Sequence, residues 1–310
     1  MNSCFHFLES TENLIDAYPY YVVFWFIFTT MSFFLTIIGN SIVIYAFWTA
    51  PSIAPPSRVF FINLAVSDLL VGLVVLPLSA VYRARIFIRL NSQSNDYDSS
   101  LECDITKTVG FFALFLSGVS LNSIAVIAVD RCLGLSLHLR YHELVTAVRA
   151  LIVVATVWIW SFSMALTSMV FSLKDIVNSS FILFKIVITT CAYIKIYKIA
   201  RHHQNQIFDE AEIENQNNQL VRFVRASKLA FNSLYIFVIM LICYAPYGII
   251  SPFFRKSPNP SPSLALGMSV SISISLCNSC INPLVYCWKI RAVRVRAINL
   301  LTRVLPGWNT

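Results

Sequence analysis

The chain has 310 residues, of which 57% are hydrophobic and only 12% are charged. A soluble domain carries about 25% charged residues, so this composition excludes an ordinary soluble domain and predicts a protein that lies largely in a membrane. The formal net charge of +8 comes without an aromatic-interleaved basic patch or a glycine-rich phosphate loop, which argues against nucleic-acid and nucleotide binding.

Seven apolar stretches are long enough to cross a bilayer, which takes about 20 residues. Five of them hold no charged residue, and the second holds one, Asp68. The fifth in chain order is the weakest, because it contains three lysines. The predicted spans are residues 20–48, 59–82, 108–129, 151–171, 181–200, 229–254 and 260–288.

The remaining segments are short. Residues 1–19 form an N-terminal tail, whose acidic residues and lack of a basic start do not fit a signal peptide. A polar outer loop is expected at 83–102, and a Gln-, Asn- and Glu-rich inner loop at 202–220. Residues 288–310 begin with apolar and basic residues at helical spacing, typical of an amphipathic helix on the membrane surface. The fold class predicted for residues 20–287 is an all-α seven-transmembrane helix bundle, followed by that short eighth helix.

The distribution of charge predicts the orientation. With the N-terminus outside, the inner face holds 15 basic and six acidic residues, and the outer face holds seven basic and eight acidic residues. Basic residues gather on the cytoplasmic side of membrane proteins. We therefore expect a multi-pass protein of the plasma membrane with an extracellular N-terminus and a cytoplasmic C-terminus.

The eight cysteines do not form a disulfide framework. Only Cys4 and Cys103 fall on the outer side, and the other six lie in spans or at the inner face, where thiols stay reduced. Whether Cys4 and Cys103 are bridged is left open. The Cys-x-x-Cys pair of the last span has no second pair beside it, so no zinc site is expected. Asn178 begins a glycosylation sequon on the predicted outer side.

Polar side chains inside the spans are costly in hydrocarbon unless they pair, so they indicate either function or helix–helix contact. For serine and asparagine these two interpretations are evenly balanced. Asp68 is different, because a carboxylate at mid-membrane needs a cation, a proton or a cage of hydrogen bonds. The polar residues of the spans are Asn40, Asp68, Ser120, Asn122, Asn278, Ser279 and Asn282.

Short motifs follow one another through the spans. In chain order they are Gly39-Asn40, Asn63-Leu64-Ala65-Val66-Ser67-Asp68, Asp130-Arg131-Cys132, Trp158, Tyr193, Cys243-Tyr244-Ala245-Pro246, Asn278-Ser279 and Asn282-Pro283-Leu284-Val285-Tyr286. The ordered set resembles the rhodopsin-like (class A) G-protein-coupled receptors, from about residue 20 to about residue 303. The short second outer loop and the missing fifth-helix proline look most like the melanocortin, adenosine and cannabinoid receptor group.

The resemblance implies a receptor that transmits binding of an extracellular ligand to heterotrimeric G proteins. It also implies an allosteric sodium ion and no other cofactor. The sodium site maps to Asp68, Ser120, Asn278, Ser279 and Asn282. The ligand pocket maps to Phe112, Ala113, Leu116, Tyr244, Tyr247, Ser251 and Leu276.

An activation switch is implied in the same way. At rest Arg131 pairs with Asp130, and when the sixth helix swings out about Pro246 the freed arginine is joined by two tyrosines. The opened cavity then accepts a Gα subunit. The residues of this switch are Asp130, Arg131, Tyr193, Pro246, Pro283 and Tyr286.

Several positions depart from the family pattern. A sixth-helix glutamate that restrains the arginine in many relatives is Ala226 here, so we expect appreciable signalling without ligand. The fifth-helix proline is Lys185, which either reaches the membrane surface or favours an acidic ligand. The family's bridging cysteine maps to Thr106, and the adenosine-binding asparagine maps to Ser251. The identity of the ligand therefore does not carry over.

Other functions stay open to different degrees. Cys132 and Tyr244 replace family residues, which keeps a signalling-incompetent decoy of the same fold in view. A membrane transporter is a weaker alternative, because no internal repeat is visible. An enzyme is not expected, because the spans hold no nucleophile–base pair and no cluster of metal ligands.

Overall fold

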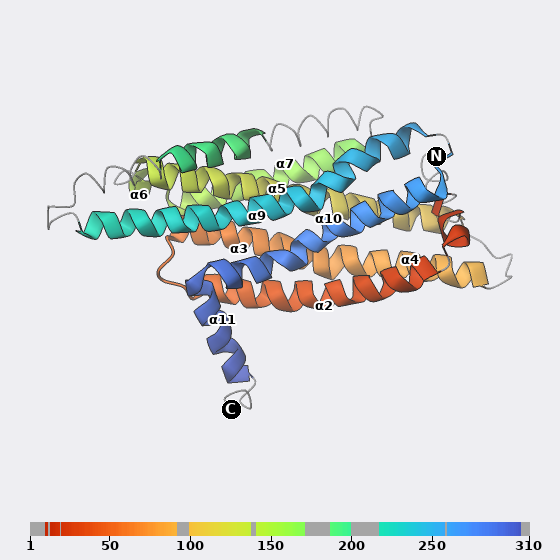
Figure 1. Cartoon of the computed structure of the whole chain (residues 1–310), viewed down its shortest axis with the longest axis horizontal. Helices are drawn as coiled ribbons and strands as arrows, with labels where there is room; N and C mark the ends of the chain where they lie inside the picture. Colours follow the sequence, from red (N-terminus) through yellow and green to blue (C-terminus); the bar gives the residue numbers. More distant parts are fainter. Residues whose placement is uncertain are drawn as a thin grey trace. The chain divides into compact units, whose positions relative to one another are not determined.

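The computed structural model describes residues 10–11, 13–18, 20–91, 99–137, 141–170, 187–199, 217–257 and 259–304. All regular elements in these ranges are helices (Figure 1). They are α2 (Tyr20–Trp48), α3 (Pro55–Leu70), the π-helical turn η1 (Val71–Val75), α4 (Leu76–Asn91), α5 (Ser99–Leu137), α6 (Tyr141–Leu144), α7 (Ala147–Val170), a helix at residues 187–199, α9 (Asn217–Lys256), α10 (Pro262–Lys289) and α11 (Arg291–Val304).

Six helical segments are long and apolar enough to cross a membrane, and each contains or closely matches a predicted span. They are Tyr20–Trp48, Pro55–Ile88, Ser100–Leu137, Ala147–Met169, Asn232–Phe254 and Pro262–Lys289. The fifth predicted span is described only at residues 187–199, where it is helical. The predicted outer loop at 83–102 is wrong at both ends, because α4 continues to Asn91 and α5 already begins at Ser99. The expected amphipathic helix is present as α11.

The second span is interrupted by the wider turn η1. The backbone N–H of Leu76 donates to the carbonyl of Val71, which is five residues earlier instead of four. Pro77 follows directly, and a proline ring in a regular helix would clash with the carbonyl four residues before it. The wider turn therefore accommodates Pro77 without that clash. It begins three residues after Asp68.

Two compact units make up the chain, and most of the long helices contribute to both. Unit 1 consists of Met1–Ser41, Val66–Ser117 and Ile239–Leu284. Unit 2 consists of Ile42–Ala65, Gly118–Val238 and Val285–Thr310.

Unit 1 has an apolar cluster that includes residues from the segment expected to be a tail. Leu14 and Ile15 are buried in it together with Trp25, Phe254 and Met268. Residues 13–17 are helical. An N-terminal segment that buries two aliphatic side chains is part of the packed core of this unit, which the polar composition of residues 1–19 did not indicate.

A close backbone approach in unit 1 explains a glycine. A β-carbon on Gly39 of α2 would lie 2.9 Å from the β-carbon of Pro283 in α10. Only a residue without a side chain fits there unless the helices shift, because real β-carbons keep a larger distance. Gly39 and Pro283 therefore fix how closely α2 and α10 pack.

Unit 2 is held by aromatic and polar contacts among its helices. The rings of Phe47 and Phe61 stack at 4.9 Å, and the fully buried Tyr286 meets both edge-on, at 5.5 and 5.8 Å. Asn63 of α3 accepts a hydrogen bond from the Trp158 indole of α7 at 2.7 Å. Asp130 and Arg131 lie in the same unit, so these contacts belong to the packing that surrounds them.

Candidate functional site

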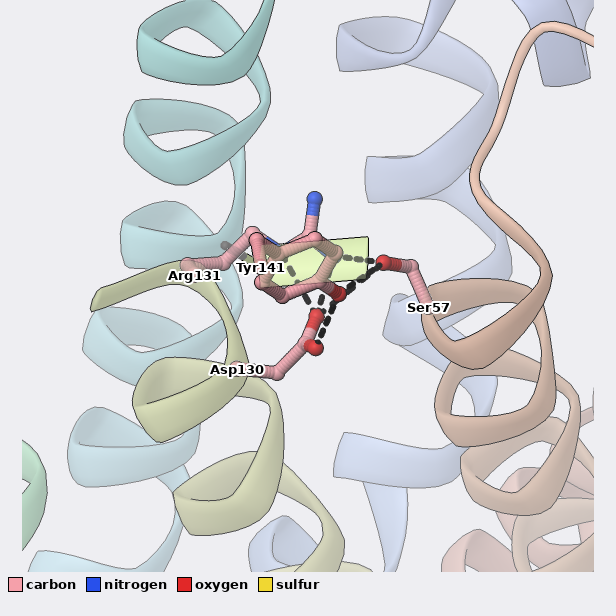
Figure 2. Close-up of polar contacts among 4 residues, drawn as sticks. All are labelled: Ser57, Asp130, Arg131 and Tyr141. Carbon is pink, nitrogen blue, oxygen red and sulfur yellow. Dashed lines mark hydrogen bonds and ion pairs between the residues drawn. The ribbon is translucent and has the colours of Figure 1, made fainter. Parts of the chain in front are cut away.

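Asp130 and Arg131, near the end of α5, form a buried ion pair (Figure 2). The arginine Nε donates to Asp130 Oδ2 at 3.0 Å, and its Nη2 donates to both Asp130 and Ser57. The two residues are only 4% and 8% exposed. A buried ion pair is stable only when further hydrogen bonds satisfy its charges, so the neighbouring donors decide how firmly Arg131 is held.

Two further residues complete this network. The Tyr141 hydroxyl in α6 donates to Asp130 Oδ1 at 2.6 Å, and Ser57 Oγ, in the first turn of α3, donates to Asp130 Oδ2 at 3.1 Å (Figure 2). Both carboxylate oxygens are thus engaged. The contact between Asp130 and Arg131 is the one expected from the sequence, which indicated no role for Ser57 or Tyr141. We call these four residues the arginine network.

The environment of Tyr141 keeps its hydroxyl protonated. Burial, and after it the negative charge of Asp130, raise the pKa of Tyr141 above its ordinary value. The neutral phenol can therefore donate to the carboxylate throughout the physiological range. Ordinary changes in pH therefore do not deprotonate the Tyr141 hydroxyl.

The two tyrosines of the expected switch lie in aromatic contacts. Tyr193, in the helix at residues 187–199, is buried and stacks on Phe237 of α9 with ring centres 5.4 Å apart. Tyr286 packs against the Phe47–Phe61 pair described above. Pro246 lies inside α9 and Pro283 inside α10. Both helices continue through their proline without a break.

Asp68 lies at the centre of a second polar group, within unit 1. Its Oδ1 accepts from Ser279 Oγ at 2.8 Å, and its Oδ2 accepts from Asn282 Nδ2 at 2.7 Å. Asp68, Asn278, Ser279 and Asn282 are all buried. Three of the four residues expected beside Asp68 are therefore in the same unit, namely Asn278, Ser279 and Asn282. The last two of these bond to it. The fourth, Ser120, is buried in unit 2.

Buried polar atoms near Asp68 lack partners within the described part of the chain. Both side-chain atoms of Asn278, and the Oδ1 atoms of Asn282 and Asn40, accept or donate no hydrogen bond there. Such an atom costs about 1–3 kcal/mol when it is left unsatisfied. An oxygen-rich, buried and incompletely satisfied group is suited to hold a hard cation or water.

The predicted ligand-pocket residues belong to unit 1 without exception. Leu116 is 2% exposed, and the other six are half-buried. Tyr247 packs against the apolar cluster that contains Leu14 and Trp25. The predicted pocket is therefore next to a core formed in part by the N-terminal segment.

A cluster around Lys289 was not predicted. The ammonium nitrogen of Lys289 lies 3.8 Å from the ring centre of Tyr235 and 3.5 Å from that of Trp288. Asn232 Nδ2 of α9 donates to the backbone carbonyl of Lys289 at 2.8 Å. That carbonyl ends α10, where helical carbonyls lack helical partners. The cluster thus joins the inner part of α9 to the end of α10, and its pairing could not be read from sequence spacing.

The outer-side residues are only partly described. Cys103 is in a disulfide bond, and six further cysteines are free thiols. Cys4, Asn178 and Lys185 lie outside the described residues, so the bridge between Cys4 and Cys103 stays an open alternative and the sequon stays a prediction. In the described ranges, no three His, Cys, Asp or Glu residues come together as metal ligands.

Known proteins similar to this chain are receptors. A family model described as "7 transmembrane receptor (rhodopsin family)" matches residues 39–181. The adenosine receptor A2a of Canis lupus familiaris is 26% identical over 298 residues, which cover 84% of this chain and 68% of the relative. The adenosine receptor A2b of Gallus gallus is 27% identical over 321 residues, covering 87% and 86%.

A solved structure supports the fold independently. The structure of squid rhodopsin matches with a TM-score of 0.74 at 20% identity, covering 94% of this chain and 86% of that chain. This likeness confirms the predicted seven-transmembrane all-α fold. The matched proteins are receptors, which confirms that the chain is not an enzyme. By its apolar helices and its fold, the chain is a multi-pass membrane protein, and it is similar to the rhodopsin-like (class A) receptors and, among them, to the adenosine receptors.

Proposed function

We propose that this receptor transmits binding of an extracellular ligand to heterotrimeric G proteins across the plasma membrane. The observation that carries the proposal is the arginine network, because it holds a buried arginine by contacts that a rearrangement of helices can break. The positive-inside distribution of charge supports an extracellular N-terminus and a cytoplasmic C-terminus. In that orientation the network would face the G protein.

The receptor exchanges between a resting and an active arrangement. At rest Arg131 is held by Asp130 and Ser57, and in the active arrangement α9 moves about Pro246 while Arg131 turns toward a Gα subunit. Tyr193 and Tyr286 leave their aromatic contacts to pack beside it. The two arrangements differ by a few kcal/mol, so an outer ligand and an inner partner can each bias the balance.

A sodium ion stabilises the resting arrangement at Asp68. Within unit 1 its oxygen ligands come from Asp68, Asn278, Ser279 and Asn282. The unsatisfied amide of Asn278 supports this assignment, since a cation would engage its oxygen. The ion supplies positive charge that compensates the buried carboxylate.

The ligand binds among the predicted pocket residues in unit 1. Tyr244, Tyr247 and Phe112 make this region largely aromatic, which favours a small hydrophobic ligand or a lipid. The curated relatives are called adenosine receptors, but Ser251 stands at the position of their adenosine-binding asparagine. Adenosine is therefore a ligand to test and not the one we favour.

G-protein activation without ligand tests the proposal directly. The full chain is purified in nanodiscs and mixed with a panel of heterotrimeric G proteins, and binding of labelled GTPγS is followed. The wild type should accelerate nucleotide exchange, and Arg131→Ala should abolish the acceleration at equal receptor concentration. Absence of exchange with every Gα class would support the decoy alternative, a protein of this fold that does not signal.

A further inference from the structure

Unit 2 contains a cavity that the proposed function does not use. Its volume is about 570 Å³, which lies within the usual range for sites that bind small molecules. Fifteen residues line it, contributed by α3, α5, α6, α7, the turn before α7 and the helix at residues 187–199. Only three of them are polar: Asn122, Asp130 and Arg149.

Two of these polar residues are already engaged within the protein. Asn122 donates to Ser161 Oγ at 3.0 Å, and Asp130 belongs to the arginine network. Arg149 is exposed, and within the described ranges its side chain donates only through Nη1, to the backbone carbonyls of Glu143 and Leu144. A guanidinium has five N–H donors, so Arg149 keeps donors and a positive charge for a ligand.

The cavity opens toward lipid. Val129, Leu133, Val153 and Trp160 line it and are 37–44% exposed despite being large and apolar. A contiguous exposed apolar patch is unfavourable in water and marks a surface covered by another apolar body. Since these residues lie on membrane-spanning helices, the bilayer is the medium that meets the opening.

The spacing along α7 between two lining residues matches the thickness of one leaflet. Arg149 lies in the first turn of α7, and Trp160 is 11 residues further along the same helix. This separation is about 16 Å at 1.5 Å per residue. Half of a hydrocarbon core is about 15 Å. A charged group at Arg149 and an apolar chain that ends near Trp160 would therefore span one leaflet from headgroup to midplane.

We propose that this cavity binds one acyl chain of an anionic phospholipid, with the headgroup phosphate at Arg149. The charge of Arg149 and the N-terminal end of α7, which is partially positive, select the anionic headgroup. The apolar lining takes the chain. The proposal uses the orientation given under the proposed function, in which Arg149 faces the cytosolic leaflet, the leaflet that is rich in anionic lipid.

Lipid retention measures this binding without any signalling assay. The full chain is released from nanodiscs that contain phosphatidylcholine and a minor fraction of phosphatidylglycerol, and bound lipids are counted by native mass spectrometry. The wild type should retain one phosphatidylglycerol in preference to phosphatidylcholine. Arg149→Gln should lower that preference about fivefold, as expected for one basic residue near the membrane surface. Ala150→Phe, which fills the cavity, should remove the bound lipid.

Matched controls separate the site from general effects. Arg296→Gln removes an equal charge from exposed α11, and Leu151→Phe enlarges a lipid-exposed side chain of α7 that does not line the cavity. Both should retain phosphatidylglycerol as the wild type does. Equal loss of bound phosphatidylglycerol in the controls and in Arg149→Gln would overturn the proposal. Equal retention of phosphatidylglycerol and phosphatidylcholine by the wild type would overturn it as well.

A second measurement covers the case in which Ala150→Phe fails to fold. Phosphatidylglycerol with a brominated chain should quench the fluorescence of Trp160, obtained as the difference between the wild type and Trp160→Phe. Arg149→Gln should reduce this quenching. Quenching by brominated free fatty acid that phosphatidylglycerol cannot displace would overturn the phospholipid assignment. Loss of G-protein activation leaves both readouts unchanged, so failure of the proposed function is distinguishable from failure of this one.

Discussion

Asn40 donates its side-chain amide to the backbone carbonyl of Ser279 at 3.0 Å. Ser279 lies four residues before Pro283, and a proline has no N–H to offer the carbonyl of that residue. The asparagine of α2 thus satisfies the carbonyl that the proline of α10 frees. The same amide also donates to Thr36 within its own helix at 2.9 Å, so both of its N–H groups are used.

Replacing Asn40 by alanine should destabilise the receptor by about 1–3 kcal/mol, because a buried carbonyl is left unsatisfied in an apolar surrounding. The thermal unfolding midpoint of the purified chain in nanodiscs is the measurement. Thr30→Ala is the control, since Thr30 is half-exposed and bonds only to Phe26 of its own helix. Equal midpoints for Asn40→Ala and the control would contradict the role given to Asn40.

This pairing shows which part of the fold sequence alone could predict. Gly39-Asn40 and Asn282-Pro283 were each recognised as motifs, because a motif depends on neighbouring residues. The hydrogen bond from Asn40 to Ser279 joins positions 239 residues apart, and no local period encodes such a contact. The spans were predictable for the same local reason, since length and apolar composition decide whether a helix can cross a bilayer.

The missed residues have a common cause. Ser57 and Tyr141 lie outside the predicted spans, and the composition of such segments does not indicate which side chain reaches Asp130. Leu14 lies in a segment whose acidic residues suggested a solvated tail, although it is buried in the core of unit 1. In each case a tertiary contact, and not local propensity, decided where the side chain lies.

Removing the Tyr141 hydroxyl should loosen the arginine network. Tyr141→Phe keeps the ring and removes one donor to Asp130, and a hydrogen bond to a charged group contributes about 1.5–3 kcal/mol. If half of this free energy stabilises only the resting arrangement, its loss should raise ligand-free GTPγS exchange severalfold. Tyr197→Phe, on an exposed tyrosine of the helix at residues 187–199, should leave exchange unchanged. Lower exchange in Tyr141→Phe would contradict the resting-state role.

The pH dependence of the same variant follows from the raised pKa of Tyr141. A group whose pKa is higher in the folded state stabilises the fold fully below its unfolded pKa, which is about 10 for tyrosine, and loses that contribution as pH rises further. The stability difference between wild type and Tyr141→Phe should therefore be constant from about pH 6 to 9. Denaturation at several pH values is the measurement, and a slope within that window would show that the hydroxyl titrates there.

Sodium should stabilise the receptor through Asp68. A ligand that binds only the folded state raises stability as its concentration exceeds the dissociation constant, so the unfolding midpoint should rise when sodium replaces choline at constant ionic strength. Asp68→Asn keeps the size of the side chain and removes the charge, and its midpoint should no longer respond to sodium. Potassium serves as the ion control. An equal response to sodium in both proteins would exclude Asp68 as the site.

The Lys289 cluster should restrain α9 in the resting arrangement. Its ammonium group lies over the rings of Tyr235 and Trp288, and a cation–π contact contributes about 0.5–2 kcal/mol. Since Tyr235 is on α9 and Lys289 ends α10, outward movement of α9 breaks the contact. Lys289→Gln should therefore raise ligand-free GTPγS exchange by about twofold to thirtyfold. Lys198→Gln removes an equal charge from the exposed face of the helix at residues 187–199 and should leave ligand-free GTPγS exchange unchanged. Ala226 stands where many relatives have a restraining acid, and the Lys289 cluster would restrain α9 in place of that acid. Unchanged exchange in Lys289→Gln would mean that the cluster only anchors the end of α10.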